Sequence, residues 1–567
     1  MCKQKKQLRN VIMQNGRIKY LFSGVLIAAT VTLFNGCGQG AYKMEFREKL
    51  TIINEIMLEE PPAMDGVIIC NPDIITQFYE KSKKLLSVAW NSRENLDQML
   101  FVLHNVYREG LNPEDYHLSA IEKLADKIIL SDEAEAADIA RLELLLTDSF
   151  LLLSAHLAAG KTDAGIIDPQ WKASRRVLRI DWGKFIDSTL QNKHIIENLQ
   201  KLTPEHREYS NLKKALAVYL QIEEKGGWGR FNTVSPKLEK GMWNPDIALL
   251  RNRLAITQGY FKDTIDDKNL FDQYLYEQVI LFQLRNGLTP DGVVGKATIE
   301  AMNIPVEDRI ATIDANLERW RWLSNDLGER YIKVNIANFE LQVIEKDDMV
   351  FSTEAIVGLT SRETPVFSSI MTYLVLNPDW TVPPTILNTD IIPSVINNPA
   401  YLTEKNLKIL RIDGTEVDPS TIDWINIVTT GFPYRIHQEP GPKNALGRVK
   451  FVFPNQYSVY IHDTPNHNLF GRSDRSLSSG CIRVNNPLAL AAWLMKDSPA
   501  WTPTQIKYVI DQGKERTVNL DIPIQVHIVY LTAWASDDGL VYFRKDIYNR
   551  DQPLMAALKQ SSPLIDQ

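Results

Sequence analysis

The spacing of apolar residues changes at about Tyr331, and this change limits the folds that the chain can adopt. Before it, apolar residues recur three and four positions apart, as in 97–107 and 140–153, which is the period of an amphipathic helix. After it, apolar and polar residues alternate, as in 331–336 and 339–344, which is the period of a strand. A helical block followed by many short strands predicts an α+β protein with several domains.

The chain has 567 residues, which is too long for one hydrophobic core and indicates roughly three or four domains. Within the strand-rich part, 384–446 returns to a helical period, and an insertion of this size between strands is expected to cap a cleft. The sequence therefore predicts a leader at 1–37, a helical scaffold domain at 43–235, a small helical module at 245–303, a strand-rich domain at 306–535 that contains the insertion, and a C-terminal tail at 536–567.

Composition excludes one class of partner. Hydrophobic residues make up 44% of the chain and charged residues 23%, as in ordinary soluble proteins. The net charge is −7, whereas a nucleic-acid-binding protein usually presents a basic domain or stripe. We therefore expect no nucleic-acid partner.

The N-terminus has the pattern of an export signal. The uncharged apolar run 20–34 is shorter than the about 20 residues that a spanning helix needs, and Cys37 follows it closely. The segment 33–37 resembles a lipobox, which implies lipidation at Cys37 and a membrane anchor, with plain cleavage or an uncleaved anchor as alternatives. Met13 is an alternative start. Several basic residues precede the run: Lys3, Lys5, Lys6, Arg9, Arg17 and Lys19.

The chain has only four cysteines: Cys2, Cys37, Cys70 and Cys481. Exported proteins usually pair their cysteines or avoid them. Cys481 stands in a small, polar, glycine-containing motif, which favours a reactive thiol. Cys70 follows an apolar run and is interpreted as a small buried hydrophobe.

Cys481 and His462 form the minimum set for thiol catalysis. An imidazole at the end of the predicted strand 457–462 removes the thiol proton, and the thiolate attacks a carbonyl carbon. The small residues 478–480 allow the backbone to approach a substrate, and consecutive N–H groups there would stabilise an oxyanion. The alternative is a buried structural cysteine beside a strand histidine.

The wider motif is more specific than this pair. The segment 462–470, then Arg475, then 478–484 resembles the signature of the L,D-transpeptidase catalytic domain (YkuD-type), and within that family the YcbB-like periplasmic enzymes of Gram-negative bacteria. Many relatives have His where this chain has Ser479. The YcbB-like branch has Ser there, which leaves His462 as the base.

The small helical module has its own resemblance. The pattern of Phe282, Gly287, Gly292, Gly295 and Thr298 is similar to a peptidoglycan-binding domain, a three-helix unit. The alternative is that the glycines only turn the chain. Together the two resemblances imply a helical scaffold, this module, and a β-sandwich-like catalytic domain with an inserted capping subdomain.

The residues expected at the catalytic centre are few. The resemblance implies Cys481 as nucleophile, His462 as general base and acid, and the backbone carbonyl of Asp463 as the group that orients the imidazole. The N–H groups of Gly480 and Cys481 are candidate oxyanion donors. Tyr460, on the same strand face as His462, is expected to add its hydroxyl, with core packing as the alternative.

A second set is expected to bind the donor peptide. Arginine binds carboxylates through paired donors, so Arg475 and Arg483 are candidates, although an internal role that holds the loop is favoured for Arg483. Trp380 matches a tryptophan of the family's cleft wall, with core packing as the alternative. Ser478 and Ser479 complete the predicted substrate-binding set.

The resemblance implies a peptidoglycan L,D-transpeptidase without metal or organic cofactor. Its partners would be stem peptides and glycan. The thiolate would cleave the bond between meso-diaminopimelate and the terminal D-Ala, and a second diaminopimelate amine would resolve the thioester into a 3→3 cross-link. Water as acceptor would give an L,D-carboxypeptidase, and a lipoprotein lysine would give protein attachment. The oligomeric state stays open.

Other classes of protein fit this sequence less well. Papain-like and NlpC/P60-like peptidases place Cys before His, the reverse of the order here. A zinc site from His462, His467 and Cys481 lacks a second cysteine or paired-histidine spacing. A non-enzymatic wall-binding scaffold would require an unreactive Cys481. The scaffold histidines have no metal-ligand spacing either: His104, His117 and His156.

Overall fold

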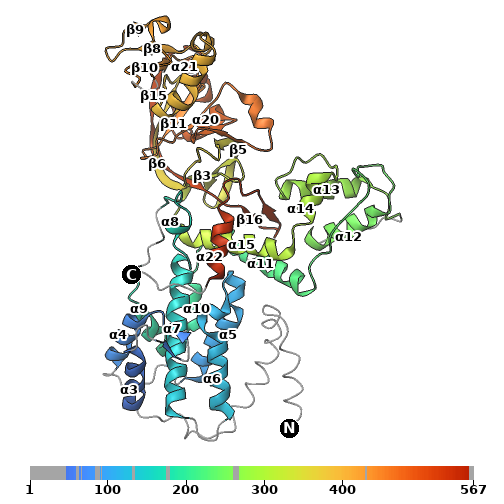
Figure 1. Ribbon diagram of the computed structural model, residues 1–567, viewed down its shortest axis with the longest axis vertical. Helices are drawn as coiled ribbons and strands as arrows, with labels where there is room; N and C mark the ends of the chain where they lie inside the picture. Colours follow the sequence, from blue (N-terminus) through green and yellow to red (C-terminus); the bar gives the residue numbers. More distant parts are fainter. Residues whose placement is uncertain are drawn as a thin grey trace.

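A computed structural model gives the arrangement of the chain (Figure 1). It describes residues 46–58, 63–64, 67–82, 90, 92–130, 135–173, 176, 179–258, 267–427 and 431–560. The predicted leader and Cys37 lie outside these residues. The described apolar side chains form four separate clusters, one in the helical domain, one in the small module, one in the capping insertion and the largest around the catalytic sheet.

The helical domain is arranged around one long apolar helix. This helix, α7 (Ala136–Ala159), is the one described helix that is long and apolar enough to cross a membrane, and 83% of its most apolar window is buried inside the protein. Its apolar residues face other helices on nearly every side, which makes it the core of the domain. The neighbouring elements are α3 (Phe46–Met57), β1 (Ala63–Met64), β2 (Val67–Ile68), α4 (Pro72–Ser82), α5 (Arg93–Asn105), η2 (Val106–Glu109), η3 (Pro113–Tyr116), α6 (Leu118–Leu130), α9 (Trp182–Asn192) and α10 (Ile195–Gln200).

The small module contains α12 (Asp246–Gln258), α13 (Gln273–Arg285) and α14 (Lys296–Met302). Gly292 has φ +72°, and a Cβ there would lie 2.1 Å from the Tyr276 ring, so this turn requires glycine. The Gln283 side chain accepts from the Gly292 N–H at 2.8 Å and donates to Asp291 at 2.8 Å. These contacts close the module over its own core.

The catalytic sheet curls until its ends meet. Its strands lie in the order β13, β5, β14, β12, β11, β6, β15, β3, β4, and β5 also pairs with β4. The long β5 does this by pairing with β4 over 348–354 and with β14 over 355–356. The result is the β-rich domain that the sequence predicts. The strands are β3 (Arg330–Asn335), β4 (Glu340–Glu345), β5 (Asp348–Gly358), β6 (Phe367–Leu376), β11 (Val449–Val452), β12 (Ile461–His462), β13 (Ser476–Ser478), β14 (Ile482–Val484) and β15 (Arg516–Val529).

Helices join this sheet to the rest of the molecule. The helices α11 (Arg207–Glu224) and α15 (Val306–Trp322) pack together between the sheet and the helical domain, where α8 (Ala164–Ile167) also lies (Figure 1). At the far end of the sheet, α20 (Pro487–Leu494) and α21 (Pro503–Asp511) cover one face, and Leu490 and Ile506 enter the main core.

One predicted strand is much shorter than the sequence indicates. The alternation over 457–462 predicts a six-residue strand, but β12 spans only Ile461–His462. Ser458 has φ +55°, and the Asn455 side chain accepts from the N–H groups of Tyr457 and Val459. This side-chain capping turns the backbone just before the strand begins.

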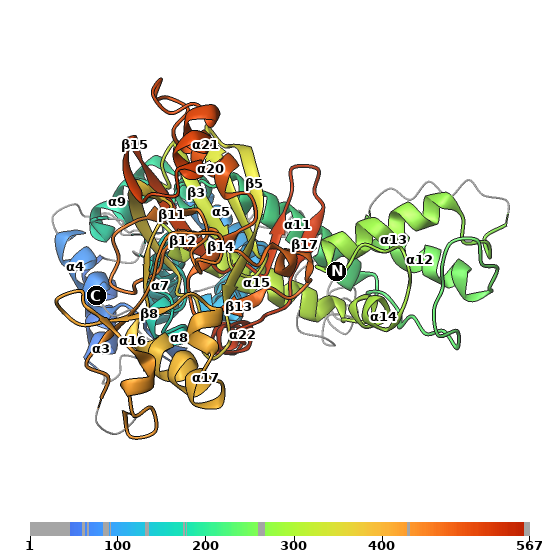
Figure 2. The same ribbon diagram turned by 90° about the horizontal axis from the view of Figure 1, so that it is seen from above.

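The capping insertion has its own sheet and core. The strand order is β7, β10, β8, β9, so that Trp380 and Gln438 lie in register at its base. Figure 2 shows α17 on one flank of the molecule, away from α20. The elements are β7 (Trp380–Thr381), α16 (Pro384–Ile386), η4 (Leu387–Ile391), α17 (Ile392–Asn397), α18 (Tyr401–Glu404), β8 (Lys408–Leu410), β9 (Glu416–Val417), η5 (Pro419–Thr421) and β10 (Arg435–Gln438).

The predicted C-terminal tail is wrong for 536–560, because these residues complete the main core. The hairpin of β16 (Ala533–Ala535) with β17 (Val541–Phe543) and the helix α22 (Asp551–Lys559) bury Phe543, Tyr548 and Leu554. The helices α11 and α15 supply the other side of the core here.

Replacing Leu554 by alanine tests this correction. The side chain is 1% exposed, so Leu554→Ala should lower the free energy of unfolding of the catalytic body by about 2–5 kcal/mol. Gln552→Ala on the exposed face of the same helix is the control and should change little. Denaturant unfolding followed by tryptophan fluorescence measures both, and equal midpoints would mean that α22 is dispensable.

Candidate active site

Two short parallel strands bring the predicted catalytic residues onto one face. In the pairing of β12 with β14, Ile461 lies beside Ile482 and His462 beside Arg483. Ile461 and Ile482 are both 0% exposed and point into the core. Because side chains alternate between faces, Tyr460, His462, Cys481 and Arg483 share the opposite face.

The imidazole of His462 is fixed by a backbone carbonyl. Its Nδ1 lies 2.5 Å from the carbonyl oxygen of Asp463, which only accepts, so Nδ1 carries the proton of the neutral ring. The ring also interacts with the backbone of Leu446. Burial, followed by the Arg483 charge, lowers the pKa of His462 to about 3. The ring is therefore neutral at physiological pH.

Cys481 is a half-buried free thiol at the start of β14. Its Sγ lies 3.7 Å from the carbonyl oxygen of Ser458, and it also contacts the Tyr460 hydroxyl. Burial raises the pKa of Cys481, although Tyr460 and the charges of Lys450 and Arg483 oppose the effect. The resting pair is thus a neutral thiol and a neutral imidazole.

Hydrogen bonds within the loop before Cys481 fix its shape. They change the roles predicted for Gly480 and Ser478. The Gly480 N–H donates to Ser478 Oγ at 3.1 Å, and that hydroxyl donates to the Cys481 carbonyl at 2.6 Å. The structure contradicts the Gly480 N–H as a free oxyanion donor and a substrate-binding role for the buried Ser478, because these groups bond to each other. Gly480 has φ +108°, so the loop needs glycine for its backbone. The Cys481 N–H and the Tyr460 hydroxyl stay candidates for the oxyanion site.

Tyr460 connects the thiol to the cap. Its hydroxyl interacts with Cys481 and with the indole of Trp380 on β7, and burial, followed by Cys481, raises the pKa of Tyr460. The rings of Tyr460 and His462 lie 5.5 Å apart. Lys450, which the sequence did not indicate, lies opposite His462 on β11 with its Nζ 4.3 Å from the centre of the Tyr460 ring.

The two predicted arginines have different surroundings. Arg475 donates to the backbone carbonyls of Ala355, Arg472 and Phe339 at 2.9–3.1 Å, so it holds the loop, and the predicted carboxylate-binding role is wrong for this conformation. Arg483 faces Cys481 and Tyr460, and its buried Nε has no hydrogen-bond partner among the described residues. Burial lowers the pKa of Arg483.

A salt bridge ties the cap to the nucleophile loop. Arg362 forms a paired contact with Asp390 on η4, at 2.6 and 2.9 Å, and its Nη1 donates to the exposed Ser479 hydroxyl at 2.8 Å. Sequence reasoning missed Arg362 and Asp390, because a surface arginine far from the motif carries no local signal.

A pocket of about 530 Å³ lies beyond the end of β12. Neither His462 nor Cys481 is among its lining residues, which include Gly441, Arg448, Asp463, His467 and Asn485. The buried Asp463 carboxylate accepts from the Arg448 N–H at 2.8 Å and contacts His467 Nε2 at 3.1 Å. His467 is therefore engaged with Asp463, and the zinc cluster of His462, His467 and Cys481 does not form among the described residues.

Comparison with protein families accounts for this arrangement. The model described as "L,D-transpeptidase catalytic domain" (YkuD) matches residues 329–506, which hold the sheet strands from β3 to β14, the cap and both catalytic candidates. The chain carries an L,D-transpeptidase catalytic domain. A "Scaffold domain" model matches 73–216, and a "Putative peptidoglycan binding domain" model matches 244–302.

One curated relative of this transpeptidase-domain chain is the protein named "Putative L,D-transpeptidase" of Haemophilus influenzae. The two are 39% identical over 226 residues, which cover 40% of this chain and 45% of the relative. The match thus spans less than half of the relative's length. A solved L,D-transpeptidase fragment (residues 123–326) from Xylanimonas cellulosilytica aligns over 53% of this chain and 100% of its own, with 14% identity and a TM-score of 0.16.

The protonation states predict how Cys481 reacts with iodoacetamide. Because burial raises the pKa of the thiol and His462 stays neutral down to about pH 3, the alkylation rate should rise continuously from pH 6 to pH 9. It should show no step near 6.5, the ordinary histidine pKa. Peptide mass spectrometry measures the rate at Cys481. Cys70, whose pKa burial raises to about 12, gives the comparison in the same digest. A plateau already reached below pH 7 would reveal a preformed thiolate–imidazolium pair.

Proposed function

We propose that the chain is a peptidoglycan L,D-transpeptidase that forms 3→3 cross-links through a thioester on Cys481. The observation that carries the proposal is the shared face of β12 and β14, where a thiol, a neutral imidazole with its proton on Nδ1 and a buried guanidinium lie together. The donor would be a tetrapeptide stem that ends in meso-diaminopimelate and D-Ala.

In the first half-reaction Nε2 of His462 accepts the Cys481 proton as sulfur attacks the diaminopimelate carbonyl carbon. The oxyanion accepts hydrogen bonds from the Tyr460 hydroxyl and the Cys481 N–H. The C–N bond then breaks, and D-Ala leaves with the proton from His462. General acid–base transfer of this kind contributes about 10²–10⁴ to the rate.

In the second half-reaction the side-chain amine of another diaminopimelate attacks the thioester carbonyl. His462 takes the amine proton and returns it to the departing sulfur, so the enzyme regains its thiol. Water in place of the amine would give an L,D-carboxypeptidase with the same residues. Both steps proceed from neutral groups, which suits a site where burial disfavours a resting ion pair.

We propose that parts of the site around Cys481 position the donor peptide. Arg483 is the candidate for a donor carboxylate, because its buried Nε lacks a partner. Trp380 and the capping insertion would cover the stem peptide, and Ser479 lies exposed beside Cys481 where the cap salt bridge reaches it. The module 245–303 is proposed to bind glycan.

The proposed location is the periplasm of a Gram-negative bacterium, with a lipid anchor on Cys37. The family models are those of cell-wall enzymes, and the basic and apolar pattern of 1–37 supports export.

The nucleophile is tested by Cys481→Ala. This variant should make no dimer from disaccharide-tetrapeptide while keeping its circular dichroism spectrum, because alanine fits the site but cannot form a thioester. Liquid chromatography with mass spectrometry of the muropeptides measures the products. Cys70→Ala is the matched control and should retain turnover. Dimers made by Cys481→Ala would remove this thiol from the mechanism.

A carbapenem has a strained β-lactam carbonyl, and its carbon is an electrophile of the same kind as the carbonyl carbon of the donor peptide. Intact wild-type protein should gain the mass of one drug molecule on Cys481, and Cys481→Ala should gain none. His462→Ala should acylate more slowly at neutral pH, and its rate should recover only at more alkaline pH, because burial raises the pKa of the Cys481 thiol. An adduct that persists on Cys481→Ala would place the reactive centre elsewhere.

A further inference from the structure

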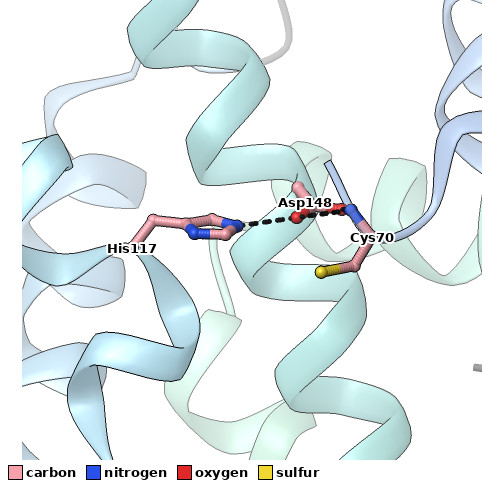
Figure 3. A group of neighbouring side chains, drawn as sticks. All are labelled: Cys70, His117 and Asp148. Carbon is pink, nitrogen blue, oxygen red and sulfur yellow. Dashed lines mark hydrogen bonds and ion pairs between the residues drawn. The ribbon is translucent and has the colours of Figure 1, made fainter. Parts of the chain in front are cut away.

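The helical domain brings together three side chains that the proposed reaction does not use (Figure 3). Cys70 lies just before α4, His117 directly follows η3, and Asp148 lies in α7. The sulfur of Cys70, a ring nitrogen of His117 and a carboxylate oxygen of Asp148 all lie within 4.8 Å of one another. This is the one such convergence of three possible metal ligands among the described residues.

We propose that Cys70, His117 and Asp148 bind one zinc ion and leave a fourth position for water or a small ligand. Thiolate, imidazole and carboxylate are the donors that Zn²⁺ takes, and a thiolate disfavours Mg²⁺ and Ca²⁺. Zinc bonds of about 2.0–2.3 Å place the ligands of a tetrahedral site roughly 3.5 Å apart. The cluster therefore needs only small side-chain rotations to close on an ion.

The carboxylate is held in place by the loop that carries the cysteine. Asp148 Oδ1 accepts from the N–H groups of Asn71 and Cys70 at 3.0 and 3.1 Å, and from the Asn71 side chain at 3.3 Å. These bonds fix the loop against α7, so the thiol and the carboxylate keep their relative positions. Such supporting bonds around a ligand are a usual feature of protein metal sites.

The imidazole of His117 is also held in position by the local backbone. His117 has φ +60°, a left-handed conformation that is costly for a residue other than glycine, and its N–H closes η3 on the Glu114 carbonyl at 3.3 Å. This turn aims Nε2 at Asp148 Oδ2, 2.7 Å away. An ion pair accounts for His117 and Asp148 alone. The Cys70 thiol, which faces them, makes a long contact of 3.9 Å with the Ile68 carbonyl oxygen.

Coordination has a simple proton balance. The ion takes the place of the proton that lies between His117 Nε2 and Asp148 Oδ2. On a neutral ring that proton moves through solvent to Nδ1, which leaves Nε2 to bind the ion. The Cys70 thiol releases its proton to solvent as the S–Zn bond forms. The side chains of His117 and Asp148 are 9% and 0% exposed, whereas Cys70 is half-buried, so an ion can enter from the cysteine side. Binding would tie the segments before α4 and after η3 to α7.

Cobalt provides a direct probe, because a thiolate–Co²⁺ bond has a charge-transfer band. Metal-free full-length protein carrying Cys481→Ala is titrated with Co²⁺, so that the active-site thiol makes no contribution. We expect one equivalent to bind with this band, Zn²⁺ to displace it, and Zn²⁺ to raise the melting temperature. Adding Cys70→Ser should abolish the band, and His117→Gln should weaken zinc binding more than tenfold.

The matched control is His104→Gln, which alters another buried histidine of this domain, one that pairs with Glu122 at 3.2 Å. It should leave binding unchanged. X-ray absorption on the zinc-loaded protein counts the sulfur ligands of the ion, and one sulfur is expected. This measurement does not require the Cys70 and His117 variants. No bound metal, a zinc ion without sulfur, or a band that survives Cys70→Ser would overturn the proposal.

Discussion

The parallel pairing of β12 with β14 is the contact on which the candidate active site depends. Ile461 and Ile482 lie side by side in the core, and their burial fixes which faces the neighbouring residues take. A shift of one residue in this register would turn His462 and Cys481 into the core. Two aliphatic side chains therefore determine where the catalytic groups lie.

The strand pair is short, so its position depends on the parts of the chain packed around it. Within α15, Arg321 pairs with Glu318, and both side chains are 0% exposed. Glu318 also accepts from the Thr162 N–H at 2.7 Å, which joins this helix to the helical domain. The buried Lys161 donates to Asp115 and to the carbonyls of Leu558 and Gln560. Buried charges with satisfied hydrogen bonds fix a single arrangement, because leaving one of them unpaired is costly.

The electrostatics of the site favour a neutral thiol at Cys481 beside a neutral imidazole at His462. Burial raises the pKa of the thiol and lowers that of the imidazole, so an ion pair is disfavoured at rest. The cap is joined to the nucleophile loop through Arg362, Asp390 and Ser479. Closure of the cap over a substrate would therefore act on the same loop that presents Cys481.

The sequence by itself determined the periods of helix and strand, the Cys481–His462 motif and the resemblance to two cell-wall domains, because these features are local in the chain. Only the tertiary structure decided that Gly480 bonds within its own loop and that Arg475 binds the distant carbonyls of Ala355 and Phe339. It also decided that 536–560 belongs to the core and that Arg362 reaches the cap. The same holds for Cys70, 78 positions from Asp148, which meets it and His117 across the helical domain. Contacts between distant residues follow from how whole elements pack, and no local spacing records them.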